Sequence, residues 1–98
     1  MASDITFEPE AEDDLSEAID YLHPSSPAAK RFSEAIDRSI GRILEFPESG
    51  TPVDGNARSV YVSGTFYSIV YELKGRAVNI LAFAHASRDP DYWRSRRR

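Results

Sequence analysis

The stretch that decides the fold is FYSIVYELKGRAVNILAFA, residues 66–84. Two runs rich in Val, Ile, Tyr and Phe, residues 66–73 and 77–84, are separated by Lys74-Gly75-Arg76, which is the pattern of a β-hairpin. Alternate residues of a strand face opposite sides, so one face of the first run is the better candidate for the core. That face carries Tyr67, Ile69, Tyr71 and Leu73, and the other carries Phe66, Ser68, Val70 and Glu72.

The strand pattern continues on the N-terminal side of this hairpin. Residues 58–62 form a third β-rich run, and Ser63-Gly64-Thr65 separates it from the hairpin, so the three runs predict an antiparallel meander. Before it, residues 47–56 are rich in Pro, Gly, Ser, Asp and Asn, which predicts a loop. A short apolar alternation at Ile5–Phe7 predicts an additional edge strand.

The remaining first half has the 3.6-residue period of helices. Pro9 stands at a first helical position, and an apolar stripe follows it until His23-Pro24 ends the helix. The stripe consists of Ala11, Leu15, Ala18, Ile19 and Leu22. Ser26 is a candidate cap for a second helix, which the 3.6-residue period predicts as far as Phe46-Pro47. The predicted fold class is α+β, in the order β-α-α-β-β-β, with an antiparallel sheet packed against an N-terminal helical hairpin.

Length and composition exclude several classes of protein. A chain of 98 residues with 41% hydrophobic residues predicts one small soluble domain, residues 1–98, without room for a second domain. The absence of cysteine excludes disulfides, zinc–thiolate sites and a thiol nucleophile. No apolar run approaches the length of a membrane span and no leader pattern is present, so we expect a cytoplasmic protein. Two isolated histidines and scattered glycines predict neither a metal site nor a cofactor.

The formal net charge of −4 conceals a division between the two halves of the chain. Residues 1–56 contain 13 acidic and 4 basic residues, a net charge of −9. Residues 57–98 contain 8 basic and 3 acidic residues, a net charge of +5, and end in a run at 94–98 that we expect to be a frayed basic tail. The division favours an acidic partner for the second half.

Four polar residues are candidates for chemistry. His85 follows a strand, where an imidazole could act as acid or base because the unperturbed pKa of that side-chain type, about 6.5, lies near neutrality; a structural hydrogen bond to a neighbouring group is the stronger reading. Arg58 and Arg88 together suit a phosphate or carboxylate, and the alternative is an ion pair with Asp89, Asp91 or an acid of the first helix. Tyr92 is suited to stacking or proton donation, or with Trp93 to pinning the C-terminal turn onto the sheet.

Two segments resemble the RelE/ParE superfamily of bacterial toxins. The opening Phe7-x-Pro9-x-Ala11-x-x-Asp14-Leu15 and the close His85-x-x-Arg88-x-Pro90-x-Tyr92-Trp93 carry the similarity, and Arg58 and the strand Tyr67–Tyr71 lie between them. These proteins are the toxins of type II toxin–antitoxin modules, often called plasmid stabilisation proteins. The resemblance implies the same β-α-α-β-β-β order and covers almost the whole chain.

The resemblance implies one of two activities. RelE-like members are metal-independent endoribonucleases that cut messenger RNA on the ribosome, and in that case Arg58, His85, Arg88 and Tyr92 match part of the catalytic set. ParE-like members inhibit DNA gyrase. Members of the nuclease branch carry lysines on the helix and loop before the sheet, and residues 42–57 of this chain contain none. The negative charge of the first half also opposes RNA binding. We therefore expect the gyrase branch, with the ribonuclease as the alternative and a non-toxic antitoxin-binding domain as a third reading.

Both branches imply an antitoxin partner. A partly unstructured antitoxin segment folds across such toxins, and the basic second half of this chain favours an acidic segment. The candidate contacts are Arg58, Arg76, Arg88 and Arg94.

Overall fold

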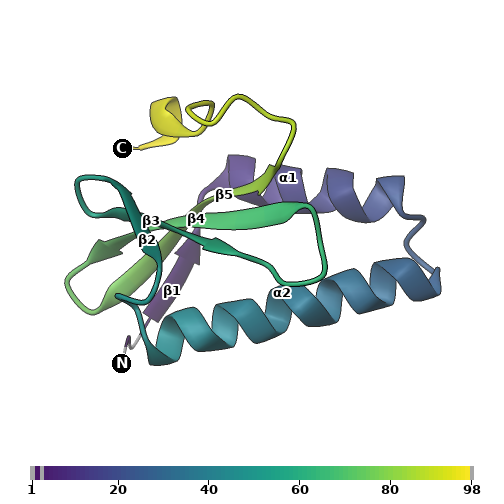
Figure 1. The fold of residues 1–98 in the computed structure, drawn as a ribbon, viewed down its shortest axis with the longest axis horizontal. Helices are drawn as coiled ribbons and strands as arrows, with labels where there is room; N and C mark the ends of the chain where they lie inside the picture. The colour runs from purple at the N-terminus through teal and green to yellow at the C-terminus, as the bar shows by residue number, and fades with distance from the viewer. Residues whose placement is uncertain (1, 3, 98) are drawn as a thin grey trace.

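The computed structural model describes residues 2 and 4–97. Two helices follow a short first strand, and four strands and a 3₁₀ turn complete the chain (Figure 1). In chain order the elements are β1 (Asp4–Phe7), α1 (Pro9–Tyr21), α2 (Pro27–Glu45), β2 (Thr51–Asp54), β3 (Ala57–Tyr61), β4 (Tyr67–Lys74), β5 (Ala77–His85) and η1 (Arg94–Arg96). The described elements confirm the predicted α+β class and the helical hairpin.

Local signals set the helix ends. Pro9 is the first residue of α1, where its missing N–H has no intrahelical partner to lose. After α1 ends at Tyr21, His23 adopts a left-handed conformation with φ 66°, which reverses the chain before Pro24. The Ser26 hydroxyl accepts a hydrogen bond of 3.0 Å from the Ala29 N–H and caps α2, as the sequence predicts.

The sheet contains one strand more than the sequence predicts and is not entirely antiparallel. Its order is β1-β5-β4-β3-β2, and β1 runs parallel to β5 whereas the other pairs are antiparallel. The antiparallel prediction is wrong for β1 because the alternation of an edge strand does not encode its direction. The predicted loop at 47–56 contains β2, whose Pro52 is tolerated because β2 is an edge strand.

One face of the sheet packs against the helices. The predicted core face of β4 is confirmed: Ile69 and Tyr71 are fully buried, and Tyr67 and Leu73 pack against the same core. The opposing helix α2 contributes Phe32, Ile36 and Ile43. Phe32 meets the Tyr67 ring edge-on, with centroids 5.1 Å apart.

The opposite face of the sheet is also buried, which confirms the reading that Trp93 pins the C-terminal turn onto the sheet. A second core joins Val70 of β4 to Leu81 and Ala82 of β5, and Trp93 covers them. An irregularity in the pairing of β4 with β5 sets Val70 opposite Ala82 and Tyr71 opposite Ile80, so Leu81 is an extra residue. Figure 1 shows the C-terminal segment on the side of the sheet opposite α2. No helix in the described part of the chain is long and apolar enough to cross a membrane.

Candidate functional site

A buried carboxylate on α1 joins three parts of the molecule. Asp14 is only 9% exposed, and its Oδ2 atom accepts hydrogen bonds from the Phe83 N–H at 3.1 Å and from the Tyr92 hydroxyl at 3.0 Å. The Arg96 guanidinium binds both carboxylate oxygens, at 2.6 and 3.1 Å. We call Asp14, Tyr92 and Arg96 the carboxylate clamp. It ties α1 to β5 and to the C-terminal segment.

The clamp completes the edge of β5. Strand β1 pairs only with Ala77–Ile80, so the backbone of β5 beyond Ile80 has no strand partner on that side. Asp14 accepts from the Phe83 N–H there, Tyr92 donates to the Phe83 carbonyl at 3.3 Å, and Arg96 donates to the Leu81 carbonyl at 3.0 Å. Side chains therefore satisfy backbone groups that would otherwise be unpaired at a partly buried edge.

The clamp holds Tyr92 as a neutral phenol. Burial and the neighbouring Asp14 carboxylate raise the pKa of Tyr92 to about 12. Burial lowers the pKa of Arg96, but its hydrogen bond to Asp14 and the carboxylate charge outweigh this and leave that pKa raised. The guanidinium carbons of Arg88 and Arg96 lie 4.0 and 4.6 Å from the Tyr92 ring centroid. Near neutral pH Tyr92 can donate a proton in a hydrogen bond but cannot act as a base.

The terminal arginines are held by carboxylates, which corrects the expectation of a frayed basic tail at 94–98. Glu72, 3% exposed, accepts from Arg97 Nε at 3.1 Å and lies 3.3 Å from Lys74 Nζ. Asp54 accepts from Arg94 at 2.6 Å and from Arg97 at 3.0 Å. The expectation was wrong because acids outside the run hold these side chains, and all of these acids except Asp91 are distant from it in sequence. Arg98 lies outside the described residues.

His85 and Arg88 lie near one another at the end of β5. The half-buried His85 ring meets the Tyr67 ring edge-on at 5.0 Å, and its Nδ1 is 2.9 Å from the Ser87 hydroxyl oxygen. Both residues line a small hollow of about 210 Å³, together with Tyr21, Tyr67 and Phe83. The Arg88 side chain is exposed, and its guanidinium group lies over the Tyr92 ring. It forms no ion pair with Asp89 or Asp91, the partners considered for it from the sequence.

Arg58 does not join this group. It lies opposite Tyr71, in the middle of β4, whereas His85 lies opposite Tyr67, the first residue of β4. Its Nη1 donates to the carbonyl oxygens of Glu48 and Gly50, at 2.9 and 2.8 Å. Arg58 therefore holds the loop after α2, and neither the shared anion site with Arg88 nor the ion pair weighed for it from the sequence is present.

Tyr71 and Gly50 complete the support of this loop. The Tyr71 hydroxyl donates to the Pro47 carbonyl at 2.7 Å and accepts from the Gly50 N–H at 3.1 Å. A Cβ at Gly50 would lie 2.6 Å from that hydroxyl oxygen, so the close approach requires glycine.

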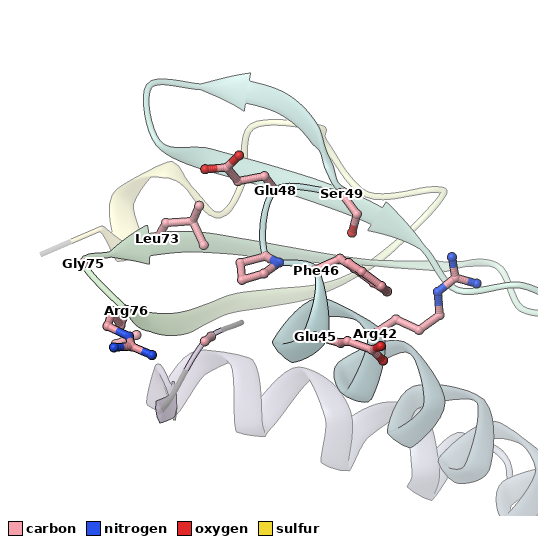
Figure 2. A pocket seen from close by; sticks show the side chains of 11 residues that line it. Arg42, Glu45, Phe46, Glu48, Ser49, Leu73, Gly75 and Arg76 are labelled. Atoms are coloured by element: carbon pink, nitrogen blue, oxygen red, sulfur yellow. The ribbon is translucent and has the colours of Figure 1, made fainter.

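A groove of about 770 Å³, which we call the first groove, lies between the end of α2 and the β4–β5 turn (Figure 2). Phe46, 57% exposed, and Leu73 are apolar residues of its lining. Figure 2 shows Arg76 at one end of this groove and Arg42 at the other. Glu45 and Glu48 also line it, so its charges are mixed.

Sequence reasoning missed Asp14, Glu72, Arg96 and Arg97 as organising residues. A signal for Asp14 exists, because it lies three residues after Ala11 and four before Ala18 and therefore falls on the apolar stripe of α1. No comparable signal distinguishes Arg96 from its neighbours. Among the described residues no cluster of three or more His, Asp or Glu side chains is suited to hold a metal ion.

The fold and this arrangement define a small α+β protein with a helical hairpin on one face of a five-stranded sheet and a clamped C-terminal segment on the other. Residues 5–90 match the family described as ParE toxin of type II toxin-antitoxin system, parDE, and the chain belongs to this family. It is thus the ParE-like toxin component of a type II toxin–antitoxin system, as the resemblance implied.

Similar proteins agree with this assignment. Toxin ParE2 from two strains of Mycobacterium tuberculosis, CDC 1551 / Oshkosh and H37Rv, is 28% identical over 82 residues, covering 82% of this chain and 78% of the relative. A chain of the chromosomal ParDE TA system from P. aeruginosa has the same fold, with a TM-score of 0.70 at 15% identity. That match covers 84% of this chain and 94% of the other.

Proposed function

We propose that this toxin acts in the cytoplasm by inhibiting DNA gyrase and that a cognate antitoxin neutralises it. One observation carries the choice of gyrase over messenger RNA: the four residues that match the nuclease set do not form one open site. Arg58, opposite Tyr71 in the middle of β4, supports the loop after α2, whereas Tyr92 is held by Asp14 of α1 beside Phe83 of β5. A nuclease of this kind needs its groups around a single scissile phosphate.

Charge supports the same choice. The outer side of α1 presents exposed carboxylates to solvent, whereas the bases Arg94, Arg96 and Arg97 are already bound to acids of the chain. The exposed acids are Glu12, Asp13, Glu17 and Asp20. Binding to ribosomal RNA depends on neutralising phosphates with free lysine and arginine side chains. A protein target suits this surface better.

Two assays on the purified protein separate the activities. We expect inhibition of gyrase-dependent DNA supercoiling and no cleavage of messenger RNA on programmed ribosomes. His85→Ala should retain gyrase inhibition, because that proposed activity uses no catalytic acid or base. Cleavage of messenger RNA that is lost in His85→Ala or Arg58→Ala would contradict the proposal.

The ribonuclease remains the second candidate because His85 and Arg88 line one hollow. This candidate assigns phosphate binding to Arg58 and Arg88, but Arg58 is held by the carbonyls of Glu48 and Gly50 and shares no site with Arg88, so Arg88 alone would face a phosphate at this hollow. His85 or Tyr92 would transfer the proton, and the pKa of Tyr92, about 12, leaves it only the role of acid. The third reading, a domain that binds antitoxin without toxicity, predicts normal growth on induction. Growth arrest with DNA-damage signalling supports gyrase, and immediate loss of translation supports the ribonuclease.

An acidic antitoxin segment is the partner that we propose. Of its four candidate contacts, Arg76 and Arg88 are exposed, and Arg88 lies beside the C-terminal segment. Arg94 is engaged with Asp54 and Asp91, and Arg58 with loop carbonyls, so both would have to exchange existing bonds. We therefore favour Arg76 and Arg88 among the four.

A further inference from the structure

A cavity of about 430 Å³, which we call the second groove, lies between α2 and the strands β2 and β3. Two arginines of α2, Arg38 and Arg42, line it together with the ring of Tyr61 and five small hydroxyl residues. These residues are Ser39, Ser49, Thr51, Ser59 and Ser63. No carboxylate is among the described residues of its lining, which distinguishes it from the first groove. Its volume lies in the range of small-molecule sites, about 300–1,000 Å³.

The polar side chains of the second groove are available for a ligand. Both arginines are exposed, and neither guanidinium makes a hydrogen bond or ion pair with another described residue. The hydroxyl groups of the four serines and of Thr51 likewise have no hydrogen-bond partner in the described part of the chain. Four residues apart on a helix, the arginines lie on the same side, separated by a rise of about 6 Å. Such a set of donors without an acidic acceptor suits the oxygen atoms of a phosphate.

The aromatic ring in this lining is held in place but left uncovered. The Tyr61 hydroxyl donates to the Thr65 carbonyl at 2.6 Å, so one end of the ring is fixed to the β3–β4 turn. The Tyr61 side chain is nevertheless 63% exposed. A positioned and exposed aromatic ring is a surface on which a nucleobase can stack.

The surrounding charges limit the size of the anion. Asp37 and Glu45 of α2 are exposed and lie outside the lining, where they would repel a polyanion longer than the groove. Nucleic-acid backbones are bound through many phosphate contacts, whereas two arginines match one short phosphate chain. Figure 2 shows Arg42 and Ser49, which border both grooves. The lining therefore favours a mononucleotide over RNA or DNA.

We propose that the second groove binds a nucleotide with a di- or triphosphate chain. Arg38 and Arg42 bind the phosphates, hydroxyl groups such as those of Thr51 and Ser59 donate to further phosphate oxygens, and Tyr61 stacks on the base. The two guanidinium groups supply the positive charge that Mg²⁺ supplies in other nucleotide sites, so binding does not depend on a divalent cation. This site is independent of the proposed action on gyrase.

The first test is a calorimetric titration of ADP into the full chain, in EDTA and at physiological ionic strength. Arg38→Gln and Arg42→Gln should each weaken binding about tenfold, as expected for loss of a charged hydrogen bond. Arg31→Gln removes the same charge from the same helix outside the groove and should change affinity less than about twofold, because exposed charges at this distance are screened. Arg38 is the deciding position, because Arg42 borders both grooves.

The second test concerns the base. Tyr61→Leu should weaken ADP binding on the order of tenfold through loss of stacking, and Tyr61→Phe, which keeps the ring, should weaken it less than about threefold. Inorganic pyrophosphate should bind more weakly than ADP and should be insensitive to Tyr61→Leu.

Four results would overturn the proposal. They are no binding of ADP, equal weakening by Arg31→Gln and Arg38→Gln, equal affinity for ADP and pyrophosphate, and tighter binding of a short single-stranded oligoribonucleotide that Arg38→Gln abolishes. The last result would identify RNA as the ligand of the groove. Gyrase inhibition is measured separately on the same preparation without nucleotide added to the toxin, so failure of the groove and failure of the proposed function are distinct.

Discussion

Two adjacent aspartates show how position decides the role of a residue. Asp13 is exposed on α1, whereas Asp14, on the side that faces β5, is buried and accepts bonds from Phe83, Tyr92 and Arg96. A buried carboxylate is costly unless it is paired and hydrogen-bonded, and the clamp supplies both kinds of partner. Asp14 therefore acts as a structural centre rather than as a solvated helix-start acid.

Replacing Asp14 should be strongly destabilising. Asp14→Asn leaves the Arg96 charge without its carboxylate, and we expect a loss of about 3 kcal/mol in the free energy of unfolding. Urea denaturation followed by Trp93 fluorescence measures it. Asp13→Asn is the matched control and should change the free energy by less than about 0.5 kcal/mol. Equal effects of the two substitutions would show that the clamp contributes nothing to stability.

Tyr92 makes stability depend on pH in the alkaline range. Its pKa is about 12 in the folded protein against 10.0 ordinarily, so above pH 10 the unfolded chain loses a proton that the folded chain keeps. This contribution is complete below pH 10 and is lost as pH rises toward 12. For a half-buried group we expect a loss on the order of 1 kcal/mol, measured as urea midpoints across this range. Tyr92→Phe should remove that part of the slope, and an unchanged slope would contradict the assignment.

At the scale of elements, the C-terminal segment completes the sheet on two sides. Trp93 covers the far face over Val70, Leu81 and Ala82, and the clamp closes the edge of β5 where β1 ends. A short first strand leaves this edge open, and the extra residue Leu81 in β5 turns an apolar side chain to the far face. The segment after β5 is therefore a structural part of the sheet.

Removal of the Trp93 side chain tests this role. We expect Trp93→Ala to lower the free energy of unfolding by about 3–5 kcal/mol, because it leaves a cavity over the second core. The control is Phe66→Ala, an aromatic residue that is 74% exposed, and it should cost less than about 1 kcal/mol. Differential scanning fluorimetry ranks the two variants, and similar melting temperatures would contradict the second core.

At the scale of the whole molecule, the charge division between the halves of the chain serves internal pairing as well as recognition. Asp14 and Asp54 from the acidic half bind Arg96, Arg94 and Arg97 from the basic half. Part of the +5 charge of residues 57–98 is therefore compensated inside the fold.

A chain that ends at Tyr92 should lose cooperative folding at neutral pH. It would leave Asp14 and Glu72 buried without Arg96 and Arg97 and would uncover the apolar far face. Uncompensated buried charges and exposed apolar surface each cost several kcal/mol, against a total stability of about 5–15 kcal/mol. Circular dichroism against urea, with the full chain as reference, tests it. A sigmoidal transition near that of the full chain would contradict it.

The sequence by itself determined the helices, the three long strands and the family. Helix ends could be predicted because Pro9 and Ser26 determine them through their own backbone and side-chain chemistry. The core face of β4 could be predicted because it follows from the alternation of apolar residues along the strand. The candidates His85 and Arg88 could also be identified as neighbours in space, because two residues separate them in the chain.

Only the tertiary structure decided the parallel direction of β1, the pairing of β2, the burial of the far face and the separation of Arg58 from His85. It also decided which charges are structural: Asp14 and Arg96 are 82 residues apart in sequence, and nothing local distinguishes Arg96 from its arginine neighbours. Periodicity reports the face on which a side chain lies, but a long-range ion pair depends on how two distant elements pack.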